Sequence, residues 1–261
     1  MKKHVKIAHT SDVHLDGRSS NGAGGGFNNV AERAFSEVVS TVQEKQCDLF
    51  LIVGDLFDHN RIKASDIEFV RDQLDRIKCP VLLIPGNHDV YDNFSLWHKF
   101  KPEELGDNVI AIMEHEGSTI ELSELGVTIW GKAMEIHDHE NKPLQGIPEL
   151  SGGNWKIGLA HGQVAERRVT GSSSLITSEE ISNSGFDYLA LGHVHVWATY
   201  QMGEVKACYP GSPVAAYASS QGGHLAIVDL DPESGVNIAK HKLSKPEPQE
   251  HKHTSQFYLV P

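Results

Sequence analysis

The sequence has few of the features that define whole classes of protein. Only three of its 261 residues are cysteine, an odd and scattered set that predicts neither a disulfide framework nor a thiolate zinc site. No apolar run approaches the ~18 residues of a membrane span. No apolar segment follows the basic N-terminus, as it would in a secretory signal. We therefore expect reduced thiols and a cytoplasmic location.

Basic residues are also scarce. The chain has 23 Lys and Arg against 35 Asp and Glu, a formal net charge of −12. The negative electrostatic field of such a chain does not attract a phosphate polyanion, which argues against a protein that only coats nucleic acid. An enzyme that captures phosphate with bound cations is still compatible, because the cations dominate the local field.

The first half alternates apolar runs with amphipathic stretches, which is typical of a parallel sheet with crossover helices. Strands are predicted at residues 5–8, 49–53 and 81–84, and helices at 30–45 and 65–77. The glycine-rich stretch 22–26 lacks the Gly-Lys-Ser/Thr ending of a phosphate-binding loop, so we interpret it as a connection.

The second half is richer in predicted strands. They fall at residues 109–112, 119–122, 127–131, 156–160, 188–191, 199–202, 205–209, 225–230 and 236–243. We interpret the last four as an antiparallel meander. Residues 177–180 have the capping-box pattern of a helix start, and 135–155 predict a surface loop. The expected organisation is one domain over 1–245 and a polar tail over 246–261.

Residue types that bind metals follow the predicted strands. In chain order they are Asp12, His14, Asp55, Asp58, Asn87, His88, Asp89, His161, His193 and His195. In open α/β sheets, ligands bind beyond the carboxyl ends of the strands, so five segments would deliver these side chains to one edge. Carboxylate, amide and imidazole ligands without a thiolate suit Mn, Fe, Zn or Mg.

The spacing within the motifs supports this interpretation. Asp12-x-His14 and His193-x-His195 would place alternate residues of an extended segment on one side, so each pair can reach one ion. Asp55 lies centrally, where both of its oxygens can bridge two cations. One such pair alone can arise by chance on a protein surface. Five motifs, each directly after a predicted strand, indicate a metal site. The remaining histidines are interpreted as solvated, among them His98, His115, His137, His139, His251 and His253.

In order and spacing, this series resembles the calcineurin-like metallophosphoesterase superfamily. The motifs are Asp-x-His, Gly-Asp-x-x-Asp, Gly-Asn-His-Asp, a single His and Gly-His-x-His. Segments 9–15, 55–58 and 209–213 are further similar to the SbcD-type DNA-repair exonucleases. The resemblance covers roughly residues 5–230. It implies an α/β fold, a four-layer α/β/β/α sandwich of two mixed sheets flanked by helices.

The resemblance also implies roles for the motif residues. One divalent ion would be held by Asp12, His14, Asp55 and His195, and the second by Asp55, Asn87, His161 and His193. Mn is expected first, with Fe, Zn or Mg as alternatives. His88 would face the scissile phosphate without binding metal, and Asp58 or Asp89 would orient an imidazole. A water shared by the two ions would attack phosphorus, so no serine or cysteine nucleophile is required.

The expected activity is phosphodiester hydrolysis by an exonuclease-like DNA nuclease. A small phosphodiester or phosphomonoester, such as a cyclic nucleotide, is the alternative substrate, and a non-catalytic metal-bearing scaffold is a third possibility. Nucleases of this type carry a further C-terminal region that docks an ATPase partner. Few residues follow His195, so we expect that docking region to be absent. A basic rim for DNA, or merely scattered charges, would come from Arg18, Arg61, Lys63, Arg167 and Arg168.

Overall fold

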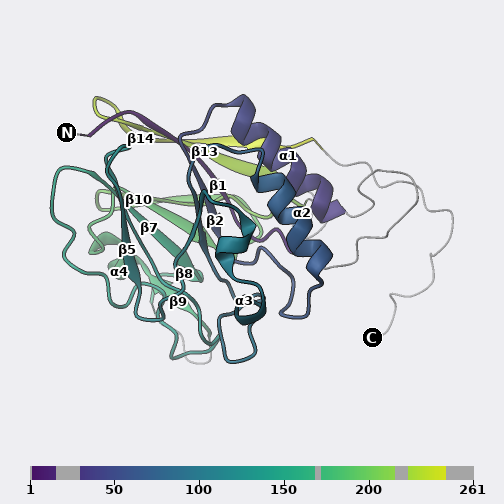
Figure 1. The fold of residues 1–261 in the computed structure, drawn as a ribbon. Coiled ribbons are helices and arrows are strands. Elements are labelled where there is room, and N and C mark those ends of the chain that lie inside the picture. The colour runs from purple at the N-terminus through teal and green to yellow at the C-terminus, as the bar shows by residue number, and fades with distance from the viewer. Residues whose placement is uncertain (1, 16–29, 168–171, 215–222, 245–261) are drawn as a thin grey trace.

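The fold is built on two six-stranded sheets (Figure 1). A computed structural model describes residues 2–15, 30–167, 172–214 and 223–244. Helices α1 (Val30–Glu44) and α2 (Ala64–Leu74) lie side by side against the outer face of the first sheet. No helix in the described ranges has both the length and the apolar character that a membrane crossing needs.

The first sheet is mixed, with strand order β14-β13-β1-β2-β3-β4. Its strands are β1 (Val5–Thr10), β2 (Leu49–Val53), β3 (Val81–Ile84), β4 (Val109–Ala111), β13 (His224–Asp231) and β14 (Gly235–Lys242). The four strands β1 to β4 run parallel, as their crossover helices require. Strand β13 pairs antiparallel with β1, and β14 pairs antiparallel with β13.

The second sheet has strand order β11-β12-β10-β7-β6-β5. Its strands are β5 (Ser118–Leu122), β6 (Val127–Gly131), β7 (Trp155–His161), β10 (Tyr188–Gly192), β11 (Ala198–Met202) and β12 (Val205–Tyr209). The inner four strands are parallel, and the edge strands β5 and β11 are antiparallel. The remaining elements are the strand pair β8 (Gln163–Ala165) and β9 (Leu175–Thr177), helices α3 (Leu96–Lys99) and α4 (Ser178–Ser182), and a 3-10 turn at Pro102–Leu105.

Alternating side chains divide the core into layers. Along β2, Leu49, Leu51 and Val53 point into the space between the sheets, where Ile157 and Leu159 of β7 meet them. The intervening residues of β2 point the other way and pack under α1 and α2. Because both faces of the parallel strands are covered, these strands are apolar throughout. The two sheets therefore pack face to face and can bring their carboxyl ends to one edge.

The α/β fold with two mixed sheets is confirmed, but one expectation about it is wrong. The last four strands do not form a single meander: β11 and β12 extend the second sheet, whereas β13 and β14 extend the first. Local alternation of apolar and polar residues predicts hairpins but not the sheet that each hairpin joins.

The short pair β8–β9 was not predicted, because its segment is mostly polar. Among the described residues, the helix that covers the outer face of the second sheet is α4, a short helix that begins with the predicted capping box at Thr177. The stretch 22–26 and the tail 246–261 lie outside the described residues.

Candidate metal centre

The predicted motif residues converge where parallel strands of both sheets end. The segment after β1 runs beside the segment after β2, because Asp12 N donates to Gly54 O (3.1 Å) and His14 N donates to Asp55 O (3.0 Å). The segment after β10 joins them, since His193 N lies 3.1 Å from the Asp12 carboxylate. Strands that are far apart in sequence thus deliver their polar side chains to one place.

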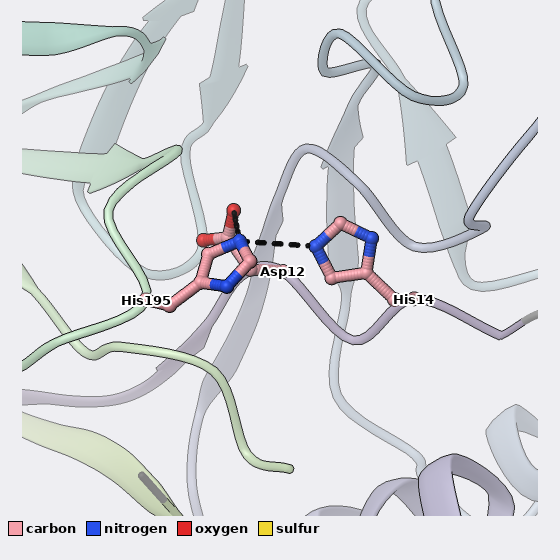
Figure 2. A group of neighbouring side chains, drawn as sticks. All are labelled: Asp12, His14 and His195. Atoms are coloured by element: carbon pink, nitrogen blue, oxygen red, sulfur yellow. Dashed lines mark hydrogen bonds and ion pairs between the residues drawn. The ribbon is translucent and has the colours of Figure 1, made fainter. Parts of the chain in front are cut away.

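The first group of side chains consists of Asp12, His14 and His195, which Figure 2 shows facing one another. The Nε2 atoms of His14 and His195 are 3.2 Å apart, and His195 Nε2 lies 3.6 Å from Asp12 Oδ1. Asp12 is fully buried and His14 nearly so. A buried carboxylate between two converging imidazoles is a suitable donor set for a divalent cation.

The second group gathers around the side-chain oxygen of Asn87. This oxygen lies 2.8 Å from His193 Nδ1 and 3.0 Å from His161 Nε2. His161 Nε2 is also 3.3 Å from Asp55 Oδ2. Burial and the neighbouring His161 lower the pKa of His193 to about 4, so its ring is neutral and able to bind a metal at ordinary pH.

Asp55 lies between the two groups. Its Oδ2 atom is 3.3 Å from His161 Nε2 and 4.0 Å from His14 Nε2, whereas its Oδ1 accepts a hydrogen bond from His88 N (2.8 Å). One oxygen, rather than the expected two, therefore faces both groups. Burial acts to raise the pKa of Asp55, but His161 and His14 outweigh it and hold that pKa well below its usual range.

Hydrogen bonds at Nδ1 orient two histidine rings so that Nε2 points into the site. His161 Nδ1 lies 2.9 Å from the Val53 carbonyl, which can only accept, so Nδ1 carries the hydrogen and a neutral ring leaves Nε2 free. His14 Nδ1 is 3.0 Å from Asp58 Oδ1 and is oriented in the same way. Burial lowers the pKa of His161, but Asp55 raises it more, to about 9 overall. An ion that binds there therefore has to displace a proton.

Four of the motif residues have left-handed backbone conformations. The φ angles are 56° at Asp12, 54° at His14, 53° at Asp55 and 97° at His193. The expectation that Asp12-x-His14 and His193-x-His195 are extended is therefore wrong; the side chains meet because the chain turns sharply. Such conformations are costly for residues with a Cβ, and they cluster at functional sites where the surroundings hold them.

Two acidic residues differ in what they contact. Asp58 Oδ1 is 3.0 Å from His14 Nδ1 and 3.4 Å from His88 Nδ1, so it can orient both rings. Asp89 is fully buried and accepts hydrogen bonds from main-chain amides. The donors are the N–H groups of Gly86 (2.7 Å), Leu56 (3.0 Å), Asp55 (3.2 Å) and Phe57 (3.3 Å). Of the two expected orienting residues, only Asp58 lies against an imidazole within the described part of the chain, whereas Asp89 ties together the two segments that carry Asp55 and Asn87.

His137, which was expected to be merely solvated, lies at the site. Its ring packs edge-on against that of His193, with centroids 5.1 Å apart. Partial burial and nearby His161 lower the pKa of His137. Sequence reasoning missed it because no motif surrounds it, and only the fold brings its loop here. His115 is also half-buried, with Nε2 2.8 Å from Tyr91 O, while His98 and His139 are exposed as expected.

Comparison with known proteins identifies the family to which this chain belongs. A family model for calcineurin-like phosphoesterases matches residues 5–197, well over half of the chain. The chain belongs to this family. It is therefore a hydrolase of phosphoester bonds, and its family uses a dinuclear metal centre.

The curated relatives of this phosphoesterase are distant and longer. It is 26% identical over 284 residues to the SbcD component of the SbcCD nuclease of Bacillus subtilis, covering 94% of this chain and 71% of the relative. It is 24% identical over 230 residues to the uncharacterized metallophosphoesterase YhaO of the same organism, covering 84% of this chain but only 55% of the relative. A probable cyclic nucleotide phosphodiesterase of Coxiella burnetii is 31% identical over 100 residues, which is 38% of this chain and 37% of that one.

A solved structure supports the fold alone. Purple acid phosphatase PPD1 from yellow lupin superposes with a TM-score of 0.57 at 11% identity, over 93% of this chain and 52% of that one.

Proposed function

We propose that this phosphoesterase hydrolyses nucleic-acid phosphodiester bonds as an exonuclease-like DNA nuclease with two divalent metal ions. The observation that carries the proposal is the position of Asp55 Oδ2 between the two donor groups, 4.0 Å from His14 Nε2 and 3.3 Å from His161 Nε2. Similarity to the SbcD component of the SbcCD nuclease, over almost the whole chain, supports nucleic acid as the substrate class.

The donor set fits the proposed ions. One ion would be held by Asp12, His14, Asp55 and His195, and the other by Asp55, Asn87, His161 and His193. With hard oxygens and imidazole nitrogens but no thiolate, Mn is the first choice, and Fe, Zn or Mg are alternatives. When bound, two such ions supply Lewis-acid activation of the phosphate and of the attacking water.

His88 would supply the acid. Its main-chain N–H is fixed on Asp55, its Nδ1 lies 2.8 Å from the Asp58 carbonyl, and its side chain is 41% exposed. The Asp58 carboxylate lies 3.4 Å from the same nitrogen, so it can help to orient the ring. The other ring nitrogen would then donate its proton to the leaving oxygen, or offset negative charge in the transition state.

A small nucleotide substrate is the second candidate. The similarity to a probable cyclic nucleotide phosphodiesterase favours it. The net charge of −12 favours it as well, because a small nucleotide does not require a basic DNA-binding surface. Of the predicted basic rim, Arg61, Lys63 and Arg167 are exposed, while Arg18 and Arg168 lie outside the described residues. A non-catalytic scaffold is disfavoured by the exposed His88 beside the site. An ATPase partner and a cytoplasmic location stay predictions.

One assay tests the proposal. The purified protein with Mn²⁺ would be offered bis-p-nitrophenyl phosphate, p-nitrophenyl phosphate, cyclic nucleotides, and single- and double-stranded DNA. Release of nucleotides from DNA is expected, and Asp55→Asn should abolish it. Turnover of cyclic nucleotides alone would favour the second candidate. Failure on every phosphoester would overturn both enzyme proposals.

A further inference from the structure

Within the described residues, the metal centre is open to solvent on the side of His88 and His195. The side chains of Asp12, Asp55 and His161 are at most 2% exposed, whereas those of His88 and His195 are 41% and 32% exposed. A phosphate that reaches the proposed ions therefore approaches past His88 and His195. Any other side chain on that approach is a candidate to touch the substrate.

His137 lies on this open side. Its ring is exposed but packs against His193, and His161, Asp55 and His88 all act on it electrostatically. It is thus close to both the second donor group and the proposed acid.

The loop that carries His137 is held on both sides. Met134 O accepts a hydrogen bond from Tyr91 N (2.9 Å), which lies just after the His88 segment. Asp138 O accepts one from Ser174 N (2.9 Å), which precedes β9. Although the His137 side chain is exposed, its main chain is therefore fixed between two segments at the site, as a substrate-binding side chain requires.

The chemistry of the ring suits a phosphate. Within the described part of the chain, no hydrogen-bond partner is found for the His137 ring. An imidazole carries at least one N–H in either protonation state, so a donor is available. Building on the proposed function, we propose that His137 is a substrate-binding residue that donates a hydrogen bond to a non-bridging oxygen of the phosphate at the metal centre.

The test compares His137→Ala, His137→Gln and the control His139→Ala, which alters an exposed histidine two residues further on. Each Mn-loaded protein would be titrated with inorganic phosphate by calorimetry, assayed on bis-p-nitrophenyl phosphate, and analysed for bound Mn. For His137→Ala we expect unchanged Mn content and a loss of about 10- to 100-fold in both phosphate affinity and kcat/KM. The Gln variant keeps an N–H donor and should recover part of the loss, and His139→Ala should match wild type.

Two results would overturn the inference. Phosphate affinity of His137→Ala equal to wild type would show that the ring does not touch the phosphate. Loss of Mn in His137→Ala would instead mean that the ring supports His193 as a ligand. Failure of the proposed function is distinguishable from both: a wild-type protein inactive on every diester would refute that function, while the phosphate titration would still decide the role of His137.

Discussion

Replacing Asp89 by alanine should destabilise the protein more than a typical substitution. The side chain is fully buried and accepts four main-chain N–H groups, which join the segments after β2 and β3. Each buried amide left without an acceptor costs ~1–3 kcal/mol, and water can restore only some of these bonds. One effect opposes the loss: burial and the charge of Asp55 raise the pKa of Asp89 to about 7, so the wild type carries a penalty that alanine removes.

Weighing these terms gives a net loss of about 3–5 kcal/mol for Asp89→Ala, because four orphaned amides outweigh the relief of one buried charge. Urea unfolding followed by circular dichroism would measure it. The matched control is Asp231→Ala, which removes a carboxylate that accepts from Glu233 N (2.7 Å) and Ser234 N (2.9 Å) in an exposed turn, and which should change stability little. A loss below about 1 kcal/mol for Asp89→Ala would refute the role given to this residue.

Three further predictions address the site. Gly54→Ala should lose the ion proposed at His161, because a Cβ at position 54 would clash with the His161 ring. The control is Gly152→Ala, which has a similar left-handed φ of +96° but no atom within 4 Å of the added Cβ. Elemental analysis should find full Mn content in this control. His88→Asn should keep both ions and slow turnover by ~10²–10⁴-fold. The loss should be larger for substrates with poor leaving groups than for nitrophenyl esters. An unchanged rate in steady-state assays would exclude His88 as the acid. In EDTA, the free energy of unfolding should fall as pH rises from 7 to 9, because the pKa of His161 is raised to about 9. The stabilisation from protonated His161 is complete below pH ~6.5 and is lost as the ring deprotonates. A urea midpoint that does not change with pH in wild type, or that falls equally in His161→Gln, would contradict this.

Much of the scaffold could be predicted from local patterns. The runs 49–53 and 81–84 are continuously apolar because both faces of β2 and β3 are buried, and the strand bounds agree with the prediction. The convergence of Asp12, Asp55 and Asn87 also followed from the sequence, because parallel strands end at one edge.

Other features depend on contacts that no local pattern encodes. The left-handed turns at Asp12 and His14 are held by bonds to the segment after β2, so their strain is invisible in the sequence. The sheet that the β13–β14 hairpin joins is decided by pairing with β1. His137 reaches the site on a loop whose main chain accepts hydrogen bonds from Tyr91 and Ser174, two residues distant from it in sequence.

Anomalous diffraction from crystals grown with Mn²⁺ would test the central claim most directly. Two peaks ~3.5–4 Å apart are expected on either side of Asp55, one within bonding distance of His14 and His195 and the other of Asn87 and His161. A single peak, or two peaks that do not share Asp55, would contradict the dinuclear site on which the proposed hydrolysis rests.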